Sequence, residues 1–111
     1  MERLVKGDVV IVPFPFSDLS AAKRRPALVL AALSGDDAVL CQITSQNVRD
    51  ESAVALGDRD FERSSLKKPS NVRPNRLFTA NRALILGVVG RIKPEAIRTV
   101  IDAVVRILEA E

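Results

Sequence analysis

The apolar positions of the chain fall into short runs that turn residues separate. The first run, residues 9–12 (VVIV), follows a Gly-Asp turn and is rich in β-branched residues. A continuous apolar run of this length favours a strand over a helix. The prolines in residues 13–16 (PFPF) remove backbone donors and are expected to close this strand. Residues 17–22 are predicted to form a loop.

Two longer runs predict a β-hairpin. Residues 26–32 and 38–44 are mostly apolar, and the turn residues 34–37 (SGDD) separate them. Runs joined by a short polar turn are typical of paired antiparallel strands. We therefore expect the start of the first strand and the end of the second to lie at the same end of the hairpin.

The pattern is weaker between residues 47 and 83. Residues 54–56 (VAL) predict a short strand, and residues 66–73 and 76–79 are interpreted as further edge segments. A last strand is predicted over residues 85–92, where two glycines permit the tight bending of a small barrel.

A predicted amphipathic helix begins at Pro94. Its apolar residues recur at i, i+3, i+4, i+7 and i+11, with charged residues on the opposite face. Asp102 and Arg106 have the i, i+4 spacing of a favourable ion pair. The face that we expect to pack in the core consists of Ile97, Val100, Ile101, Val104 and Leu108.

Together these elements predict a β-rich α+β fold. Several short strands followed by one helix indicate a strongly curved barrel of five or six strands that the helix closes. The length of 111 residues and the apolar content of 47% suit one hydrophobic core. We therefore assign residues 1–111 to a single domain.

Composition excludes several kinds of site. The chain has no His, Tyr or Trp, so His-based triads, His-ligated metal sites and His-pair ribonuclease chemistry are excluded within one polypeptide. The lone Cys41 cannot form an internal disulfide and is expected to be a small buried hydrophobe. No apolar stretch reaches the ~18 residues of a membrane helix, and the N-terminus shows no secretory pattern. A cytoplasmic protein without a membrane partner is expected.

Charge is concentrated where it bears on function. The net charge is +3, from 17 Lys and Arg against 14 acids, which favours a polyanionic partner only mildly. However, Lys23, Arg24 and Arg25 stand directly before the first hairpin strand, where the fold holds them in place, and they predict a bound anion such as a nucleic-acid phosphate. The second hairpin strand ends in Thr44 and Ser45. If the strands are neighbours, guanidinium and hydroxyl share a surface.

Five segments occur in an order that is known from one protein family. They are residues 7–10 (GDVV), 13–18 (PFPFSD), 23–29 (KRRPALV), 43–45 (ITS) and 90–92 (GRI). In order, spacing and total length, from about residue 5 to the end, the chain resembles the MazF/PemK toxins of bacterial toxin–antitoxin systems.

The resemblance implies a small SH3-like β-barrel, a homodimer and a metal-independent endoribonuclease that cuts single-stranded RNA within a short recognition sequence. No cofactor is implied. The expected partners are single-stranded RNA and a cognate antitoxin that blocks the toxin. DNA would be contacted only indirectly, through the antitoxin.

The resemblance also implies roles for individual residues. Arg25 and Thr44 match the family's catalytic residues, and Arg73, which falls at a further basic site, is expected to be catalytic as well. Some relatives carry an aspartate, proposed as general base, where this chain has Asn75, and some use a histidine in the first loop. Since an amide cannot accept a proton at neutral pH, the general base is unassigned. The expected RNA-binding residues are Lys23, Arg24, Ser17, Asp18, Ser45, Gln46 and Asn75.

Arg25 and Thr44 suit the chemistry of RNA cleavage. A guanidinium offers a rigid fork to two phosphoryl oxygens and keeps its charge at any working pH. A threonine hydroxyl can bond a non-bridging oxygen or the attacking hydroxyl more tightly as charge develops. Plainer interpretations are an ion pair of Arg25 with Asp18 and a β-forming role for Thr44. Lys67 and Lys68 are interpreted as a solvated strand edge that discourages aggregation.

A non-catalytic protein on the same barrel is the alternative. It would be either a catalytically degenerate RNA-binding module or a gyrase-inhibiting toxin. The gyrase inhibitors of this fold usually rely on a tryptophan in the C-terminal helix, and this chain has none.

Overall fold

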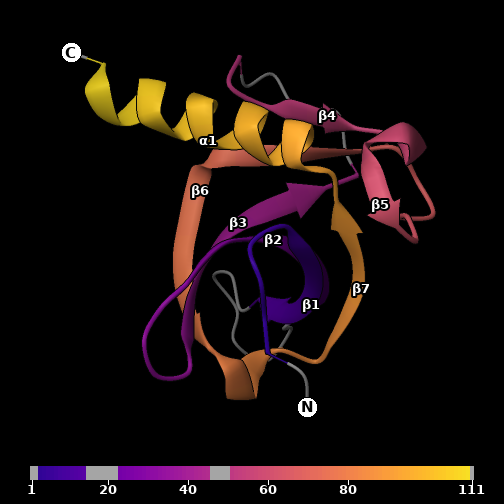
Figure 1. Cartoon of the computed structure of the whole chain (residues 1–111), viewed down its shortest axis with the longest axis vertical. Helices are drawn as coiled ribbons and strands as arrows, with labels where there is room; N and C mark the ends of the chain where they lie inside the picture. Colours follow the sequence, from indigo (N-terminus) through magenta and orange to yellow (C-terminus); the bar gives the residue numbers. More distant parts are fainter. Residues whose placement is uncertain (1–2, 15–22, 46–50, 111) are drawn as a thin grey trace.

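The computed structural model describes residues 3–14, 23–45 and 51–110 (Figure 1). Within them, seven strands form one antiparallel sheet in the order β4-β6-β3-β2-β1-β7-β5, which curls into a partial barrel. The strands are β1 (Asp8–Phe14), β2 (Lys23–Ala32), β3 (Asp37–Thr44), β4 (Val54–Leu56), β5 (Phe61–Arg63), β6 (Ser70–Asn81) and β7 (Gly87–Ile92). Short 3₁₀ turns, η2 (Asp58–Asp60) and η3 (Arg82–Leu84), and one helix, α1 (Pro94–Glu109), complete the described elements.

The barrel and its helix agree with the expected β-rich α+β class, but the strand count is higher. Seven strands replace the five or six predicted, because the weakly patterned middle of the chain supplies both β4 and β5. Residues 70–81, expected as parts of two edge segments, form the single long strand β6. The last strand begins at Gly87 rather than at residue 85, since residues 85 and 86 connect it to η3.

The first strand also continues further than the sequence suggested. Pro13 pairs with Arg24 and Phe14 with Lys23, so β1 runs through a residue that was expected to end it, and β2 already begins at Lys23. The pairing of β1 with β7 stops at Ile11. Pro13 therefore lies where β1 has a partner on one side only, and its missing N–H leaves no ladder bond unmade.

Apolar side chains cover both faces of the sheet. Because successive residues of a strand point to opposite faces, Val9 and Leu28 join the cluster that packs against Val100 of α1. Val10 and Ala27, their neighbours in sequence, join a second cluster on the opposite face. A sheet buried on both faces requires continuous apolar runs instead of alternating ones, which is the pattern of residues 9–12 and 26–32.

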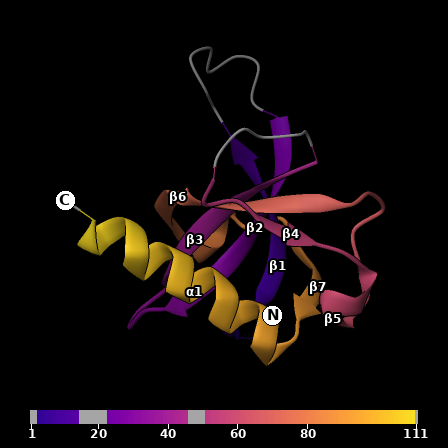
Figure 2. The same ribbon diagram turned by 90° about the horizontal axis from the view of Figure 1, so that it is seen from above.

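Helix α1 lies across β6 and β4 on one side of the curled sheet (Figures 1 and 2). Its buried residues are Ala96, Val100 and Ala103. The expectation of a core position for Leu108 is wrong: the last turn projects beyond the sheet, and Leu108 is 71% exposed. The helical ion pair also differs, since Asp102 binds Arg98 at 2.9 Å, one turn before the predicted Arg106.

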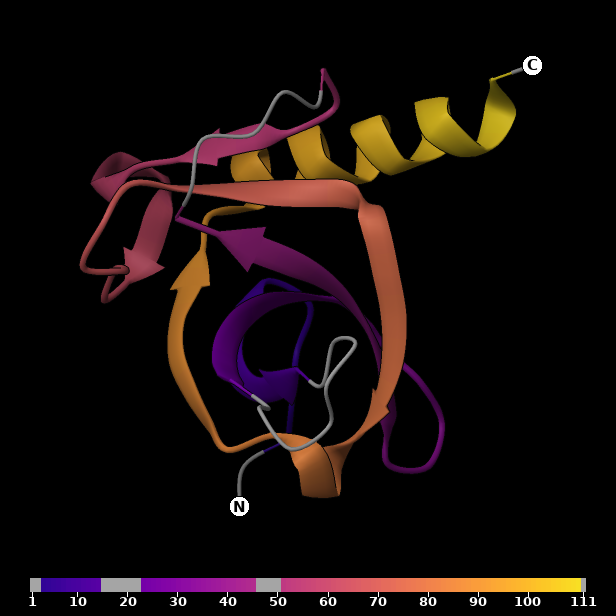
Figure 3. The same cartoon turned by 180° about the vertical axis from the view of Figure 1, so that it is seen from behind.

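Strand β6 bends sharply in its middle (Figure 3). Cys41 of β3 faces Leu77 of β6, whereas Ile43, two residues on, faces Val72, so β6 bulges outward opposite Gln42. The Cys41 thiol donates to the carbonyl of Arg73 across this bulge, with an Sγ–O distance of 2.8 Å. The bend lets a single strand pair with β3 on both sides of the bulge and with β4 at its start. No helix of the described chain combines the length and apolarity needed to cross a bilayer.

Candidate functional site

The hairpin of β2 and β3 brings Arg25 and Thr44 to the same place. Ala27 faces Gln42 in the antiparallel register, and continuing that register by two residues places Arg25 opposite Thr44. Residues directly opposite on antiparallel strands extend to the same face of the sheet. Both side chains line one surface groove with a volume of about 350 Å³. The predicted convergence of guanidinium and hydroxyl therefore holds in the fold.

Rigid backbone holds Arg25 at this groove. Pro26 follows Arg25 and restricts it to extended conformations. On the neighbouring strand β1, Arg25 is paired with Val12. Arg25 is half-buried and Thr44 is 6% exposed. Ordered neighbours and partial burial lower the conformational entropy that the two side chains lose when a ligand binds.

The groove is strongly cationic. Among the described residues that line it, four carry a positive charge and none is a carboxylate. Hydroxyl groups and apolar side chains complete its lining. The lining residues are Ile11, Arg24, Arg25, Pro26, Ile43, Thr44, Ser45, Leu66, Lys67, Lys68 and Ser70. Positive charge beside hydroxyl donors suits a phosphate, because each phosphoryl oxygen accepts charge-assisted hydrogen bonds.

Lys67 and Lys68 are the groove residues that sequence reasoning missed. Their interpretation as a strand edge is wrong, because they lie in the connection between β5 and β6 and not on a strand. The Ser70 hydroxyl donates to the carbonyl of Lys68 at 3.0 Å, which fixes this connection at the groove. The dipeptide Lys-Lys was visible in the sequence, but nothing local indicated that it folds back onto Arg24 and Arg25.

Other predicted residues do not line this groove. Lys23 is exposed at the start of β2, while Arg73 and Asn75 lie in the bulge of β6. The roles expected for these three residues stay predictions. Ser17, Asp18 and Gln46 lie outside the described residues, so the proposed ion pair of Asp18 with Arg25 is untested.

Cys41 is a core residue, as expected. It is 0% exposed, and burial raises the pKa of its thiol from the ordinary 9.0 to about 12. A thiol of this kind is protonated at neutral pH and is a poor nucleophile. Its hydrogen bond to the Arg73 carbonyl instead gives it a structural role at the bend of β6.

Comparison with known proteins adds a family and a fold. A family model described as PemK-like, MazF-like toxin of type II toxin–antitoxin system matches residues 5–108. No curated protein sequence matches significantly.

Several solved structures share the architecture. One is an endoribonuclease in complex with its cognate antitoxin from a mycobacterial species, with a TM-score of 0.75, 17% identity and 98% of each chain covered. Another is the Mycobacterium tuberculosis toxin MazF-mt6, with a TM-score of 0.73, 15% identity, and 94% of this chain and 98% of that chain covered. The MazE–MazF complex of Deinococcus radiodurans gives a TM-score of 0.75 at 18% identity, with 96% of each chain covered. Identities this low establish a shared fold only.

Proposed function

Since the chain belongs to the PemK-like, MazF-like toxins of type II toxin–antitoxin systems, we propose that it is an endoribonuclease whose groove binds and cleaves single-stranded RNA. The observation that carries this proposal is the convergence of Arg25 and Thr44 in one cationic groove. The mycobacterial structure of the same fold, itself an endoribonuclease bound to an antitoxin, supports it.

The proposed reaction is an in-line phosphoryl transfer within the RNA. The 2′-oxygen attacks the adjacent phosphorus, a P–O2′ bond forms, and the P–O5′ bond breaks. The 2′-hydroxyl gives its proton to a base, and the departing 5′-oxygen receives one. The products are a 2′,3′-cyclic phosphate and a 5′-hydroxyl, so the step consumes neither metal nor cofactor.

Each groove residue has a distinct part in this reaction. Arg25 places its guanidinium on two phosphoryl oxygens and stabilises the charge of the pentacovalent transition state. Thr44 donates its hydroxyl to a non-bridging oxygen or orients the attacking hydroxyl. Arg24, Lys67 and Lys68 bind flanking phosphates, which adds affinity and salt dependence without sequence choice.

The general base stays unassigned, and no carboxylate lies among the described groove residues. Asp18 precedes β2 in the sequence and is the acid closest in sequence to Arg24 and Arg25. It is a candidate on sequence alone. Asn75 is excluded as a base by its chemistry.

The proposed partners follow the family. We propose a cognate antitoxin as the inhibitor and the only link to DNA, as well as a cytoplasmic homodimer. Two large apolar side chains just before β7 support self-association: Leu84 and Leu86, each 53% exposed. Exposed large apolar side chains this close in sequence are candidates for an interaction surface.

The test uses a long defined single-stranded RNA in buffer with EDTA. We expect cuts at a few discrete sites, with cyclic phosphate and 5′-hydroxyl ends identified by mass spectrometry. A single 2′-deoxy substitution at a mapped site must abolish that cut while binding persists, because it removes the nucleophile. Cleavage at the deoxy position, or cleavage that requires added metal, would contradict the mechanism.

Two outcomes would favour the alternative functions. Specific RNA binding without any cleavage would identify a catalytically degenerate RNA binder. Inhibition of gyrase in a parallel DNA supercoiling assay, with RNA left intact, would identify a gyrase inhibitor on the same fold.

A further inference from the structure

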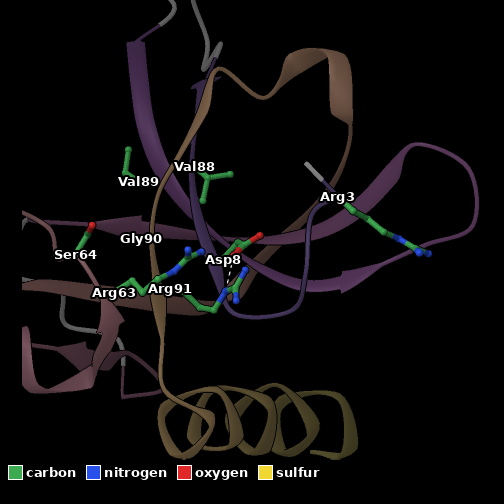
Figure 4. Close-up of a pocket in the computed structure, with 8 residues that line it drawn as sticks. All are labelled: Arg3, Asp8, Arg63, Ser64, Val88, Val89, Gly90 and Arg91. Atoms are coloured by element: carbon green, nitrogen blue, oxygen red, sulfur yellow. Dashed lines mark hydrogen bonds and ion pairs between the residues drawn. The ribbon is translucent and has the colours of Figure 1, made fainter. Parts of the chain in front are cut away.

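A second hollow lies where β1, β5 and β7 meet. It has a volume of about 320 Å³, and Figure 4 shows the side chains around it. Arg63 and Arg91 lie beside Asp8, while the side chain of Arg3 extends away from them. The described lining residues are Arg3, Asp8, Arg63, Ser64, Val88, Val89, Gly90 and Arg91. None of them lines the groove of Arg25.

Two like charges face each other across this hollow. Arg63 of β5 and Arg91 of β7 are directly paired in the antiparallel register. Like charges at directly opposite positions destabilise a sheet, and an anion between them removes the repulsion. The pairing therefore favours a site for an anion over a purely structural role.

Asp8 neutralises only one of the two arginines. Its Oδ1 accepts from Nε of Arg91 at 2.9 Å, and its Oδ2 accepts from the backbone N–H of Val5 at 3.0 Å. Both oxygens of this buried carboxylate are thus engaged. No acid among the described residues forms an ion pair with Arg63. Arg63, Arg91 and Asp8 together leave one positive charge at the hollow.

The backbone holds Arg63 in this position. Gly90 allows β7 to approach β5 closely, because a Cβ at this residue would lie 3.0 Å from the Arg63 carbonyl and 3.3 Å from the Phe61 ring. The next residue, Ser64, has a φ of 57°, which is rare outside glycine. This conformation turns the chain at the edge of the hollow, as strained backbone often does at binding sites.

One short segment connects this hollow to the groove. Arg63 and Ser64 line the hollow, whereas Leu66, Lys67 and Lys68 line the groove. Four residues in extended conformation span at most about 14 Å, so the Cα atoms of Arg63 and Lys67 are no further apart than that. A few nucleotides of an extended strand can cover this distance.

We propose that Arg63 and Arg91 form a phosphate subsite that binds an RNA nucleotide beyond those held in the groove. The proposal rests on the proposed function, since it takes RNA as the ligand. A planar guanidinium pair suits a phosphate, because each fork can bond two of its oxygens. The exposed Val88 and Val89 provide an apolar surface beside the phosphate for the sugar.

The test compares two RNAs made resistant by one 2′-deoxy residue: a short one centred on a mapped cut site and a longer one extended at both ends. Affinities are measured by fluorescence anisotropy over a range of salt concentrations. We expect wild-type protein to bind the longer RNA more tightly. In Arg63→Ala, we expect that advantage to fall about tenfold and the salt slope to decrease by about 0.7, the value for one phosphate contact on a single strand.

Arg63 is the residue to change, because replacing Arg91 leaves the buried Asp8 without its cation and endangers the fold. Arg59→Ala is the matched control, since Arg59 is an exposed arginine of η2 that lines neither cavity. It should keep the length advantage and the slope. Arg63→Lys should restore the salt slope while recovering only part of the affinity, because it keeps the charge and loses the fork.

Several results would overturn the subsite. The first is an Arg63→Ala variant that keeps the full length advantage. The second is a variant that binds RNA normally but binds the antitoxin more weakly. The third is a changed sedimentation coefficient of the variant, which would place the hollow between two copies of the chain. If wild-type protein cleaves RNA through Arg25 and Arg63→Ala has no effect, the subsite fails and the proposed function stands. If wild-type protein binds no RNA, both fail.

Discussion

Arg25 is held at the groove by its place in β2, with β1 on one side and β3 on the other. Thr44, the second residue of the proposed catalytic pair, is the last residue of β3. That they lie at the same end of one hairpin was predictable from sequence, because a short polar turn pairs the two strands. That they face each other was not, since the register shifts between Val29 and Ala31 of β2, and a shift of one residue changes which side chains share a face. The contribution of Lys67 and Lys68 was not predictable either, since a connection between two short strands has no periodicity to reveal its direction.

The hydroxyl of Thr44 can be tested without disturbing its shape. Thr44→Val keeps the β-branched side chain in a position that is 6% exposed. We expect cleavage to fall by about 10²-fold, the effect of losing one donor to transition-state charge. Single-turnover cleavage rates measure this. Thr79→Val, the same change at an exposed residue of β6, should leave the rate unaltered, and an equal loss in both variants would refute the role.

Cys41 leads to a prediction about pH. Folding raises the pKa of its thiol to about 12, so above pH 9 the unfolded chain loses a proton that the folded chain retains. The free energy of unfolding therefore decreases as pH rises from about 9 toward 12, by up to about 1.4 kcal/mol per pH unit. Cys41→Ala lacks this decrease. The difference in free energy of unfolding between wild type and Cys41→Ala, measured by urea titration, should therefore narrow as pH rises from about 9 toward 12.

Alkylation is a second test of the burial of the Cys41 thiol. Native protein at neutral pH should resist iodoacetamide, and urea-unfolded protein should react at once, since Cys41 is 0% exposed. Rapid labelling of the native protein, or a stability gap independent of pH, would show that the thiol is accessible or already ionised.

Among the elements, the turn before β1 depends on one glycine. Gly7 has a φ of 97°, and a Cβ there would lie 2.5 Å from Cδ1 of Ile97 in α1. Gly7→Ala should lower the free energy of unfolding by about 1–2 kcal/mol, the cost of a left-handed L-residue, with the flexible end of Ile97 yielding to the new methyl. Thermal unfolding followed by circular dichroism measures the loss.

Gly57 provides the contrast. It has an extended backbone with a φ of −119° and ψ of −178°, and no atom lies within 4 Å of an added Cβ. Gly57→Ala should stabilise the protein by about 0.4–1 kcal/mol, because it reduces the freedom of the unfolded chain. Equal effects at both glycines would mean that the turn at Gly7 does not require its left-handed conformation.

The elements also show where sequence patterns suffice. Continuous apolar runs predicted β1 and the β2–β3 hairpin, and helical periodicity predicted α1. The two halves of β6 were not recognised as one strand, because Pro74 in its middle normally argues against a continuous strand. The bulge opposite Gln42 accommodates this proline, which is fully buried there. Leu108 was misplaced because helical periodicity identifies a face without showing where the covering sheet ends.

For the molecule as a whole, the exposed Leu84 and Leu86 make self-association testable. Leu86→Lys should shift the sedimentation equilibrium towards monomer, because the new charge would have to lose its hydration when the contact forms. Leu33→Lys is the control, an exposed leucine beyond the end of β2. A wild-type protein that sediments as a monomer at all concentrations would contradict the proposed homodimer.

The assignment of the groove is decided by one comparison of cleavage rates. Wild type, Arg25→Ala and the exposed-surface control Arg59→Ala are each given the same single-stranded RNA in EDTA, and their folds are checked by thermal unfolding. We expect Arg59→Ala to cut at the wild-type rate and Arg25→Ala to lose about 10²–10³-fold in rate with an unchanged pattern of thermal unfolding. A folded Arg25→Ala that still cuts at the wild-type rate would show that the groove is not where RNA is cleaved.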